Sequence, residues 1–400
     1  MKVLMTIPGL SAKSGGPSTC TLDMMEGLWD VTHPGLMQQS CGSSGSKVLG
    51  ECRVDLLTVS SNDILGKGRP WLKDVPNDYR TPFVISRNIQ KYLRQSDYDI
   101  YHANALWMGS THDTCRIARK SGKPYVLSPH GMLYPTALAV KSWKKKILLN
   151  LWYNKDIMEA TCLHATCQQE AEYCRQFGYK GPIAVIPNAV VFPKGVDVKK
   201  KIYKDQKGRR QIGFLGRLHP IKKVENVIYA IDKLSDELKG KISFQIMGKY
   251  DDRYEQWLKE EVKRLHLEDN VEFVGFVSGK EKYDRLSKLS ALMVPSAQEN
   301  FGMIVPEALI CGTPVYASLG TPWGELNDWN AGWWKDNSSE TIAGVIKEIL
   351  SKSDEELLVM GKNGRQLIEE KYEQHKVAGM MKELYDWIAV DGAKPEFVLM

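Results

Sequence analysis

The stretch that decides the fold is residues 291–317, which reads A-L-M-V-P-S-A-Q-E-N-F-G-M-I-V-P-E-A-L-I-C-G-T-P-V-Y-A. Its two ends, A-L-M-V and P-V-Y-A, are short apolar runs that favour buried strands. Between them, residues 302–311 carry apolar side chains at helical spacing. A strand, a helix and a second strand in this order predict two parallel strands joined by a crossover helix.

The same alternation continues through the chain. Helical periodicity also appears at residues 223–236 and 254–265. Near-continuous apolar strands that alternate with helices indicate an α/β protein whose parallel sheets are covered on both faces. The other strand candidates are K-V-L-M-T-I, V-D-L-L-T-V, I-Y-H-A, Y-V-L-S, L-H-A-T, I-A-V-I, Q-I-G-F-L, I-S-F-Q-I-M and V-E-F-V.

The predicted strands are too many for one compact sheet. A chain of 400 residues is long enough for two domains that each bury a core. The break is expected near residues 187–208, where a charged segment without strand character follows I-P-N-A-V-V-F-P. We therefore predict two Rossmann-like domains, residues 1–187 and 188–372, with residues 373–400 as a closing segment. Ligands of such sheets bind at the carboxyl ends of strands, so the inter-domain cleft is the expected site.

The closing segment contains one more expected helix, at roughly residues 374–389. Its apolar stripe must pack against another element. The stripe consists of Met380, Leu384, Trp387 and Ile388.

Composition and net charge indicate a globular protein and argue against one that binds nucleic acid. With 43% hydrophobic and 26% charged residues the chain is an ordinary globular protein. The net charge of +6 suits an anionic ligand or an anionic membrane surface, but it is too diffuse to indicate nucleic acid. The start, M-K-V-L-M-T-I-P, matches neither a signal peptide nor a membrane span, so we expect a cytoplasmic protein.

Eight cysteines fit reduced thiols in a cytoplasmic protein. One cluster, Cys162, His164, Cys167 and Cys174, has spacings unlike those of a zinc site, and a strand that leads into a helix explains it better. No metal site is predicted.

The candidate binding residues follow strands. After Q-I-G-F-L comes G-R-L-H-P-I-K-K, where Arg217 and Lys222 precede an expected helix. An arginine, a lysine and a helix N-terminus together can bind a diphosphate, although a solvated basic loop is the alternative.

After A-L-M-V-P come two carboxylates, Glu299 on a loop and Glu307 on an expected helix that starts near Gly302. A carboxylate accepts two hydrogen bonds at once, which suits the vicinal hydroxyls of a sugar or a ribose. Two solvated glutamates near a helix start are the alternative. The amides expected to meet an anion here are those of Asn300, Phe301, Gly302 and Met303.

Two further strand ends offer weaker candidates. Gly15 and Gly16, in P-G-L-S-A-K-S-G-G-P-S, can let a phosphate or an acceptor approach the backbone closely. His130, in P-H-G-M-L-Y-P, can donate to a sugar hydroxyl or a phosphate, or it can simply cap its loop. The first motif is not G-x-G-x-x-G, so no nicotinamide or flavin cofactor is predicted.

G-R-L-H-P-I-K-K and E-N-F-G-M-I-V-P-E-A-L-I-C-G-T-P-V resemble the donor site of retaining glycosyltransferases of family 4, which have the GT-B fold. The resemblance extends over the chain through G-G-P-S, S-P-H-G-M, L-H-A-T, I-P-N-A-V and the closing helix. Two departures are Lys223, where the family often has glycine, and the turn S-L-G-T-P-W-G-E-L, where it often has two glycines.

The resemblance implies transfer of a sugar from a nucleotide-diphosphate donor to a hydroxyl acceptor with net retention. It implies that Arg217 and Lys222 hold the diphosphate, that Glu299 and His130 lie at the sugar, and that Glu307 binds the ribose. It also implies that the closing helix returns to the N-terminal, acceptor-binding domain. Because three preorganised donors can stabilise the departing phosphate and the sequence has no D-x-D-like motif, we expect no metal or other cofactor. A nucleotide-sugar epimerase and a catalytically silent nucleotide-sugar-binding subunit of the same fold are the alternatives.

The segment K-S-W-K-K-K-I-L-L-N-L-W-Y-N-K suggests a membrane-facing helix. Helical spacing places lysines beside Leu148 and Trp152, which suits an anionic bilayer and a polyprenyl-linked saccharide acceptor, as in surface polysaccharide synthesis. A buried core helix with one solvated edge is the alternative. The lysines are Lys141, Lys144, Lys145 and Lys155.

Overall fold

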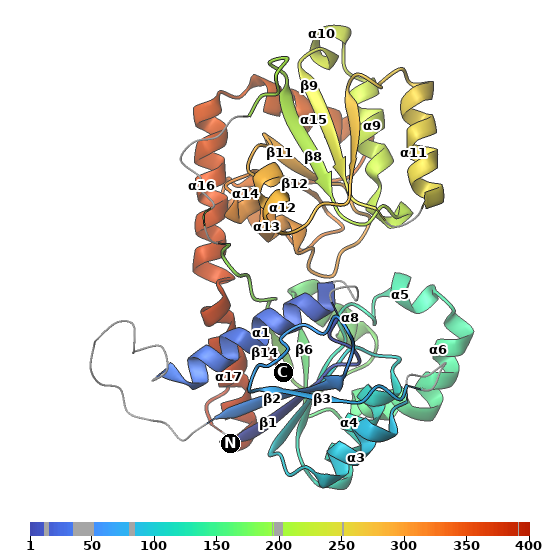
Figure 1. Cartoon of the computed structure of the whole chain (residues 1–400), viewed down its shortest axis with the longest axis vertical. Coiled ribbons are helices and arrows are strands. Elements are labelled where there is room, and N and C mark those ends of the chain that lie inside the picture. Colours follow the sequence, from blue (N-terminus) through green and yellow to red (C-terminus); the bar gives the residue numbers. More distant parts are fainter. Residues whose placement is uncertain are drawn as a thin grey trace. The chain divides into compact units, whose positions relative to one another are not determined.

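The computed structural model describes residues 1–11, 16–34, 52–79, 85–193, 195, 203–249, 252–390 and 392–400. The chain divides into two compact units. The first contains Met1–Val191 and Tyr372–Met400, and the second contains Phe192–Lys371. Each unit has its own sheet with helices on it (Figure 1), so the predicted pair of Rossmann-like domains is confirmed.

The first unit is built on a sheet with the strand order β14-β7-β6-β5-β4-β1-β2-β3. All its pairings are parallel except that of β14 with β7. The strands are β1 (Lys2–Thr6), β2 (Arg53–Val59), β3 (Leu72–Val75), β4 (Ile100–Asn104), β5 (Tyr125–Ser128), β6 (Cys162–Ala165), β7 (Ile183–Val185) and β14 (Val398–Leu399).

The helices of the first unit include the last one in the chain. They are α1 (Gly16–Thr32), α3 (Arg87–Gln95), α4 (Gly109–Lys120), α5 (Pro135–Ala139), α6 (Ser142–Leu148), the π-helix η2 (Leu149–Tyr153), α7 (Asn154–Met158), α8 (Gln168–Gln176) and α17 (Gln374–Val390). Helix α17 packs against α1, where a Cβ on Gly27 would lie 3.0 Å from that of Ala378. No helix in the described ranges is both long and apolar enough to cross a bilayer.

The second unit has a parallel sheet with the order β10-β9-β8-β11-β12-β13. Its strands are β8 (Arg210–Leu215), β9 (Ile242–Met247), β10 (Val271–Gly275), β11 (Ala291–Val294), β12 (Val315–Ser318) and β13 (Gly332–Lys335). Its helices are the 3₁₀ turn η3 (Pro220–Lys222), α9 (Val224–Asp232), α10 (Asp236–Lys239), α11 (Asp252–Arg264), α12 (Gly279–Leu286), α13 (Ile304–Ile310), α14 (Glu325–Asp328), α15 (Ser339–Ser351) and α16 (Asp354–Lys371).

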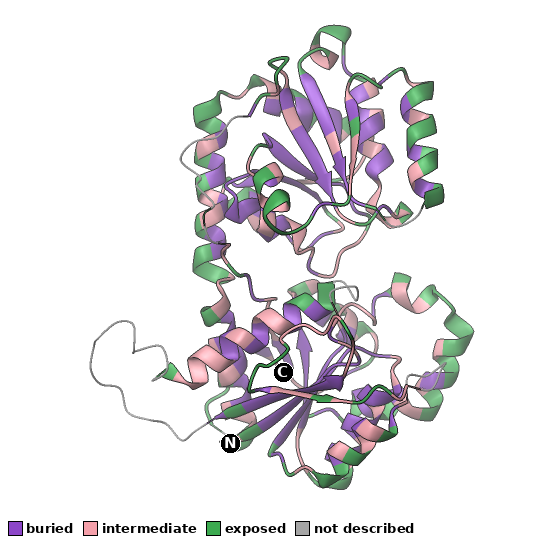
Figure 2. Ribbon diagram, in the orientation of Figure 1, coloured by how far each residue is buried: buried purple, intermediate pink, exposed green. Residues whose placement is uncertain are grey.

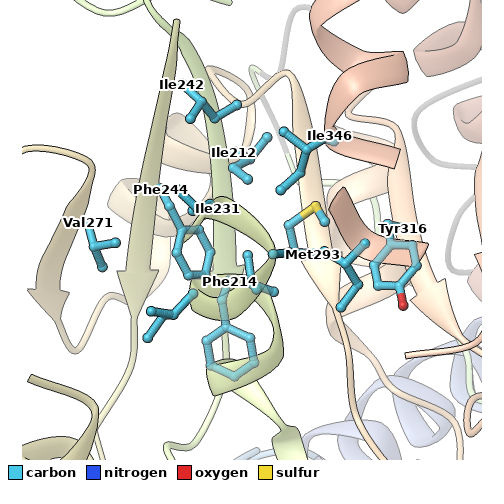
Figure 3. Packing of buried hydrophobic residues seen from close by; sticks show 14 of the residues in the cluster. Ile212, Phe214, Ile231, Ile242, Phe244, Val271, Met293, Tyr316 and Ile346 are labelled. Atoms are coloured by element: carbon cyan, nitrogen blue, oxygen red, sulfur yellow. The ribbon is translucent and has the colours of Figure 1, made fainter. Parts of the chain in front are cut away.

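Strand β8 is buried on both faces of this sheet. Ile212 and Phe214 lie in a core that also contains Ile231 of α9 and Ile346 of α15 (Figure 3). On the opposite face, a Cβ on Gly213 would lie 2.7 Å from Leu289. Burial on both faces explains the near-continuous apolar strands of the sequence, which are coloured as buried in Figure 2.

The strand predictions from sequence were incomplete. All the predicted runs form strands, but the sequence reading missed β3, β13 and β14. Each of the three lies at an edge of its sheet, and β14 has only two residues. Because an edge strand pairs on one side only and β3 is half exposed, its sequence does not carry a long apolar run.

A chain of buried hydrogen bonds crosses the first sheet and reaches α17. The carbonyl of Ile186 can only accept, so Nε2 of His164 donates to it at 2.8 Å. Nδ1 of His164 then accepts from the Ser128 hydroxyl at 2.7 Å, and that hydroxyl oxygen accepts from Nε2 of His102 at 2.6 Å. The chain ends where the Tyr385 hydroxyl donates to Nδ1 of His102 at 2.7 Å. Burial keeps both rings neutral by lowering their pKa, and the hydrogen bonds then hold each ring in one tautomer.

This chain predicts a loss of stability in acid. Burial lowers the pKa of His164 from 6.5 to about 4, and burial followed by the neighbouring His164 lowers the pKa of His102 well below 6.5. The unfolded chain binds these protons at the ordinary pKa, so the stabilisation is complete above pH 6.5 and decreases as the pH falls toward about 4. We expect the urea midpoint of unfolding to fall across this window.

His375 provides the matched control. Burial alone would lower the pKa of His375, but Glu373 and Asp30 raise it. The contribution of His375 to the free energy of unfolding is therefore present in acid and is lost as the pH rises. The variant His375→Gln should therefore lose stability at least as steeply in acid as the wild type. A midpoint that does not change over this range in either protein contradicts the assignment of neutral rings.

Candidate functional site

The strand order of the second unit reverses beside β8. The chain passes from β8 to β9 and β10 on one side, and then crosses to β11, β12 and β13 on the other side. Strands β8 and β11 are neighbours, with Ile212 opposite Ala291. Connections that leave two such strands diverge, and the crevice between them is where ligands of open α/β sheets bind.

The connection after β8 carries the two predicted cations. Arg217 is exposed two residues beyond the strand, and Lys222 closes the 3₁₀ turn η3. Nδ1 of His219 accepts from the Ile221 amide at 3.2 Å and caps this turn. Lys223 then adopts a left-handed conformation, with φ of 52° and ψ of 38°, before α9 begins. A left-handed residue at this point gives a physical reason for the glycine that the family often has there.

The connection after β11 is held from several sides. The Ser318 hydroxyl donates to the carbonyl of buried Ser296, and the Glu299 amide donates to the carbonyl of Gly320 at 2.9 Å. A Cβ on Gly320 would lie 2.2 Å from the Ala297 oxygen, so only glycine allows this approach. The Ala297 amide also donates to the carbonyl of Ile221 at 2.8 Å. The connections after β8 and β11 are thus joined through their backbones.

Lys222 and Glu299 form an ion pair between these two connections. The ammonium of Lys222 donates to Oε1 of Glu299, and the Ser296 hydroxyl donates to the same oxygen at 2.7 Å. The two charged side chains are only 14% and 12% exposed. In the part of the chain that the structure describes, no donor reaches Oε2 of Glu299. Since an ammonium has three donors, both partners keep capacity for a ligand.

The chain turns sharply after Glu299. Gly302 has a φ of +78°, and helix α13 begins at Ile304, two residues later than the expected start. Nε1 of Trp323 donates to the Phe301 carbonyl at 2.6 Å and fixes the turn. The amides of Gly302 and Met303 donate to no acceptor among the described residues. They are therefore able to bind an anion.

Glu307 lies on α13 and forms the second ion pair. Its Oε1 accepts from Nζ of Lys282, on α12, at 2.8 Å, and both side chains are 20% exposed. Burial disfavours the charged form of Lys282, but the attraction of Glu307 outweighs this effect, and the pKa of Lys282 is raised. Within the described residues, Oε2 of Glu307 accepts no hydrogen bond.

Sequence reasoning missed two residues of this arrangement. Ser296 lies two residues beyond the end of β11, and this position was a signal that strand-end reasoning could have used. Lys282 lies on the helix before β11 and has no such signal, because it is one of many lysines in the chain.

In the first unit, His130 lies in a strained turn after β5. Its φ is 51°, and Nε2 donates to Oδ1 of Asn104, at the end of β4, at 2.9 Å. Burial lowers the pKa of His130 to about 4, so the ring is neutral. The next amide, of Gly131, donates to Oε1 of the buried Glu170 at 2.5 Å. Neither Asn104 nor Glu170 was predicted, since both act through residues distant in sequence.

The two predicted glycines near the start of the chain have different outcomes. Gly15 lies outside the described residues. Gly16 is the first residue of α1 and is exposed, and a Cβ added to it would meet nothing within 4 Å. Packing within the described chain therefore does not require glycine at position 16, and its role at a ligand stays a prediction.

The predicted cluster around Cys162 is structural. His164 belongs to the hydrogen-bond chain, and burial raises the pKa of the Cys162 thiol to about 12. The described residues contain no group of three or more His, Cys, Asp or Glu side chains that could hold a metal ion.

Two known families match this chain. Residues 51–192 match Glycosyltransferase Family 4, and residues 196–367 match Glycosyl transferases group 1. The first match lies in the first unit except for its last residue, and the second match lies within the second unit, which contains the Lys222–Glu299 and Lys282–Glu307 ion pairs.

Individual proteins are similar to the chain as well. An uncharacterized glycosyltransferase of Methanocaldococcus jannaschii is 29% identical over 195 residues, which are 47% of each chain. The aligned part thus spans about half of that relative. The MMP alpha-(1->4)-mannosyltransferase of Mycolicibacterium hassiacum is 24% identical over 374 residues, which cover 84% of this chain and 86% of that protein.

A solved structure has the same fold. The crystal structure of Anabaena HepE in complex with UDP and glucose superposes with a TM-score of 0.69 at 17% identity, over 96% of this chain and 99% of HepE. This likeness shows the fold, and the two family matches show the family. The chain belongs to the family 4-type glycosyltransferases, with two Rossmann-like domains of the GT-B type.

Proposed function

We propose that the protein transfers a sugar from a nucleotide-diphosphate donor to a hydroxyl acceptor, with retention of configuration and without a metal ion. The observation that carries this proposal is the Lys222–Glu299 ion pair beside the reversal of strand order between β8 and β11. A cation for phosphate and a carboxylate for hydroxyls meet there, next to two unused amides. HepE, which has the same fold, was crystallised with UDP and glucose, and this supports a nucleotide-sugar donor.

Departure of the diphosphate is the difficult step, because negative charge develops on its phosphate while positive charge develops on the sugar. In our proposal, Arg217, Lys222 and the amides of Gly302 and Met303 receive the phosphate charge. The two N–H groups of Lys222 that Glu299 does not use are sufficient to bind phosphate oxygens while the ion pair persists. Each preorganised donor of this kind contributes on the order of 2.7–4 kcal/mol.

Glu299 and Glu307 hold the two ends of the donor. In our proposal, Oε2 of Glu299 accepts from sugar hydroxyls and Oε2 of Glu307 accepts from the ribose hydroxyls, since the ion pairs leave both oxygens without a donor in the described chain. In the reaction we propose, the bond from the sugar carbon to the diphosphate breaks and its electron pair stays on the phosphate. The acceptor hydroxyl oxygen attacks the same face of that carbon and passes its proton to the departing phosphate. A sugar adduct trapped on Glu299 contradicts this route.

We further propose that His130 acts at the sugar and that Gly15 and Gly16 act at the donor. In the neutral ring, Nε2 of His130 already donates to Asn104, so Nδ1 can accept a hydrogen bond from a sugar hydroxyl but cannot donate one. In our proposal the acceptor is a saccharide linked to a polyprenyl lipid carrier, as in surface polysaccharide synthesis. We place the protein in the cytoplasm, peripheral to the inner face of the membrane.

The proposed reaction has a direct test. Thermal-shift screening against UDP, GDP, ADP and their sugars identifies the donor, because a ligand of the native state raises the midpoint. We then expect acceptor-dependent release of the nucleoside diphosphate, unaffected by a chelator, and a product anomer that NMR identifies as retained.

Each alternative gives a different result in this assay. An inverted anomer contradicts retention, and complete loss on chelation that magnesium restores contradicts metal independence. Conversion of the donor into an epimeric nucleotide sugar, without an acceptor and without net release of nucleotide, indicates an epimerase. Donor binding without any release indicates a silent subunit.

The Lys222–Glu299 pair can be tested by a double-mutant cycle. Lys222→Ala should lower kcat by about 10²–10³-fold through the lost phosphate donor. It should also lower the free energy of unfolding by about 1–3 kcal/mol, because it leaves Glu299 desolvated without its cation. Glu299→Ala should abolish most turnover as well.

The double variant separates the two effects. Lys222→Ala combined with Glu299→Ala should recover part of the lost stability and none of the turnover. Lys223→Gly is the control, since it removes the neighbouring cation at a left-handed φ that glycine adopts readily. Recovery of turnover in the double variant, or an equal loss in the control, contradicts the assigned roles.

A second pair of variants tests the nucleoside end. Glu307→Ala should weaken donor binding by roughly 10- to 100-fold, as expected for a lost hydrogen bond to a charged group. Lys282→Ala removes the partner that positions Glu307 and should weaken binding by roughly 2- to 10-fold. Lys280→Ala, an exposed lysine on the same helix, is the control and should bind normally. Unchanged donor affinity with lost turnover in Glu307→Ala contradicts the role of Glu307.

A further inference from the structure

Large apolar side chains are exposed along the continuous helical segment α6–η2–α7 and at Val140, two residues before it. Val140, Trp143, Ile147 and Leu151 are 60%, 64%, 50% and 65% exposed. The spacing of four residues between Trp143, Ile147 and Leu151 places these three in an apolar stripe along one side of the helical segment, and Val140 precedes the segment in an extended conformation. In Figure 2, α6 is coloured as exposed over most of its length. Large apolar side chains gathered on one surface mark a site of interaction.

The predicted membrane face is corrected by this structure. Leu148 is buried, and Trp152 stacks on His112 with a ring separation of 4.9 Å. Nζ of Lys145 donates to the carbonyl of Ala137 and lies 5.5 Å above the ring of Trp107. These three side chains therefore face the protein. Helical spacing alone could not tell which apolar side was covered.

Packing of η2 fixes the orientation of the segment. The Tyr153 hydroxyl donates to the carbonyl of Met108 at 2.5 Å, and buried Asp156 accepts from Arg119 at 2.6 Å. With Leu148, Tyr153 and Asp156 turned inward, Trp143, Ile147 and Leu151 face away from the core. The outward direction of the stripe thus follows from contacts on the opposite side.

Positive charge surrounds the stripe. Lys141, Lys144, Lys146 and Lys155 are exposed, and residues 135–155 contain five lysines without any aspartate or glutamate. Nζ of Lys144 lies 5.3 Å above the ring of Trp143. Exposed Trp, Ile and Leu beside lysines match a bilayer interface, where the apolar groups enter the acyl boundary and the ammonium groups meet anionic headgroups.

We propose that this surface docks the protein on an anionic lipid bilayer through Trp143, Ile147 and Leu151. Charge complementarity favours lipid over a second copy of this chain, because two copies that met at this surface would bring their lysines together. This inference rests on the proposed function in one respect, which is that a lipid-linked acceptor gives the protein a reason to bind a membrane. Docking itself requires neither the donor nor turnover.

Flotation of the full-length protein with vesicles tests the proposal. We expect binding to vesicles of phosphatidylcholine with phosphatidylglycerol at low salt, weaker binding at high salt, and little binding to phosphatidylcholine alone. Each neutralised lysine should weaken binding by about fivefold. The charge variant combines Lys141→Gln, Lys144→Gln, Lys146→Gln and Lys155→Gln. Its control combines Lys67→Gln, Lys91→Gln, Lys120→Gln and Lys180→Gln, which are exposed elsewhere in the same unit.

A second variant set tests the apolar stripe. Trp143→Ala, Ile147→Gln and Leu151→Gln combined should reduce binding by roughly tenfold or more through the lost apolar burial. The control combines Val359→Gln, Val390→Gln and Met400→Gln, which are 52%, 75% and 73% exposed. This control should float like the wild type. The wild type and every variant must keep the same thermal midpoint.

Three results overturn the proposal. The first is a folded wild type that does not float with anionic vesicles at low salt. The second is a control set that loses as much binding as its test set. The third is a wild type that self-associates in sedimentation but does not bind vesicles, with the self-association lost in the stripe variant. The apolar stripe would then bind a second copy of this chain. Donor binding in the thermal-shift assay is read separately, so failure of docking is distinct from failure of sugar transfer.

Discussion

The pairing of β8 with β11 is the constraint on which the candidate site depends. The two strands are far apart in sequence and adjacent in the sheet, and the chain reverses its direction across the sheet between them. Their connections therefore meet at the carboxyl ends of the strands, where ligands of open α/β sheets bind. The backbone hydrogen bond from Ala297 to Ile221 then ties the two connections together. The positions of Lys222 and Glu299 follow from this geometry.

Electrostatics explains why the site is organised as two ion pairs. Each of the carboxylates of Glu299 and Glu307 is largely removed from water, which is costly for a charge without a partner. Lys222 and Lys282 compensate this cost, and each leaves one carboxylate oxygen without a donor from the described chain. The protein thus keeps two acceptors oriented while no ligand is present. Such preorganisation lowers the cost of binding a polar ligand.

The first unit uses neutral hydrogen bonds where the second uses charges. From Tyr385 to Ile186, every donor in the buried chain points the same way, because the carbonyl at its end can only accept. Burial disfavours protonation of His102 and His164 and keeps this order. The chain joins α17 to the sheet of this unit through residues that are 283 positions apart. It gives the closing helix a specific polar contact in addition to its apolar packing.

The α/β class, the two domains and the strand ends that carry the candidate residues could be predicted without coordinates. These features follow from local periodicity and from the order of elements, which nearby residues specify. Which cation meets which carboxylate was decided by the tertiary structure, since Lys222 and Glu299 are 77 positions apart and meet only through the order of the strands. The contact of Lys282 with Glu307 and the outward direction of Trp143 depend likewise on how helices rotate against their neighbours. Periodicity locates an apolar face of a helix, but packing decides which face is covered.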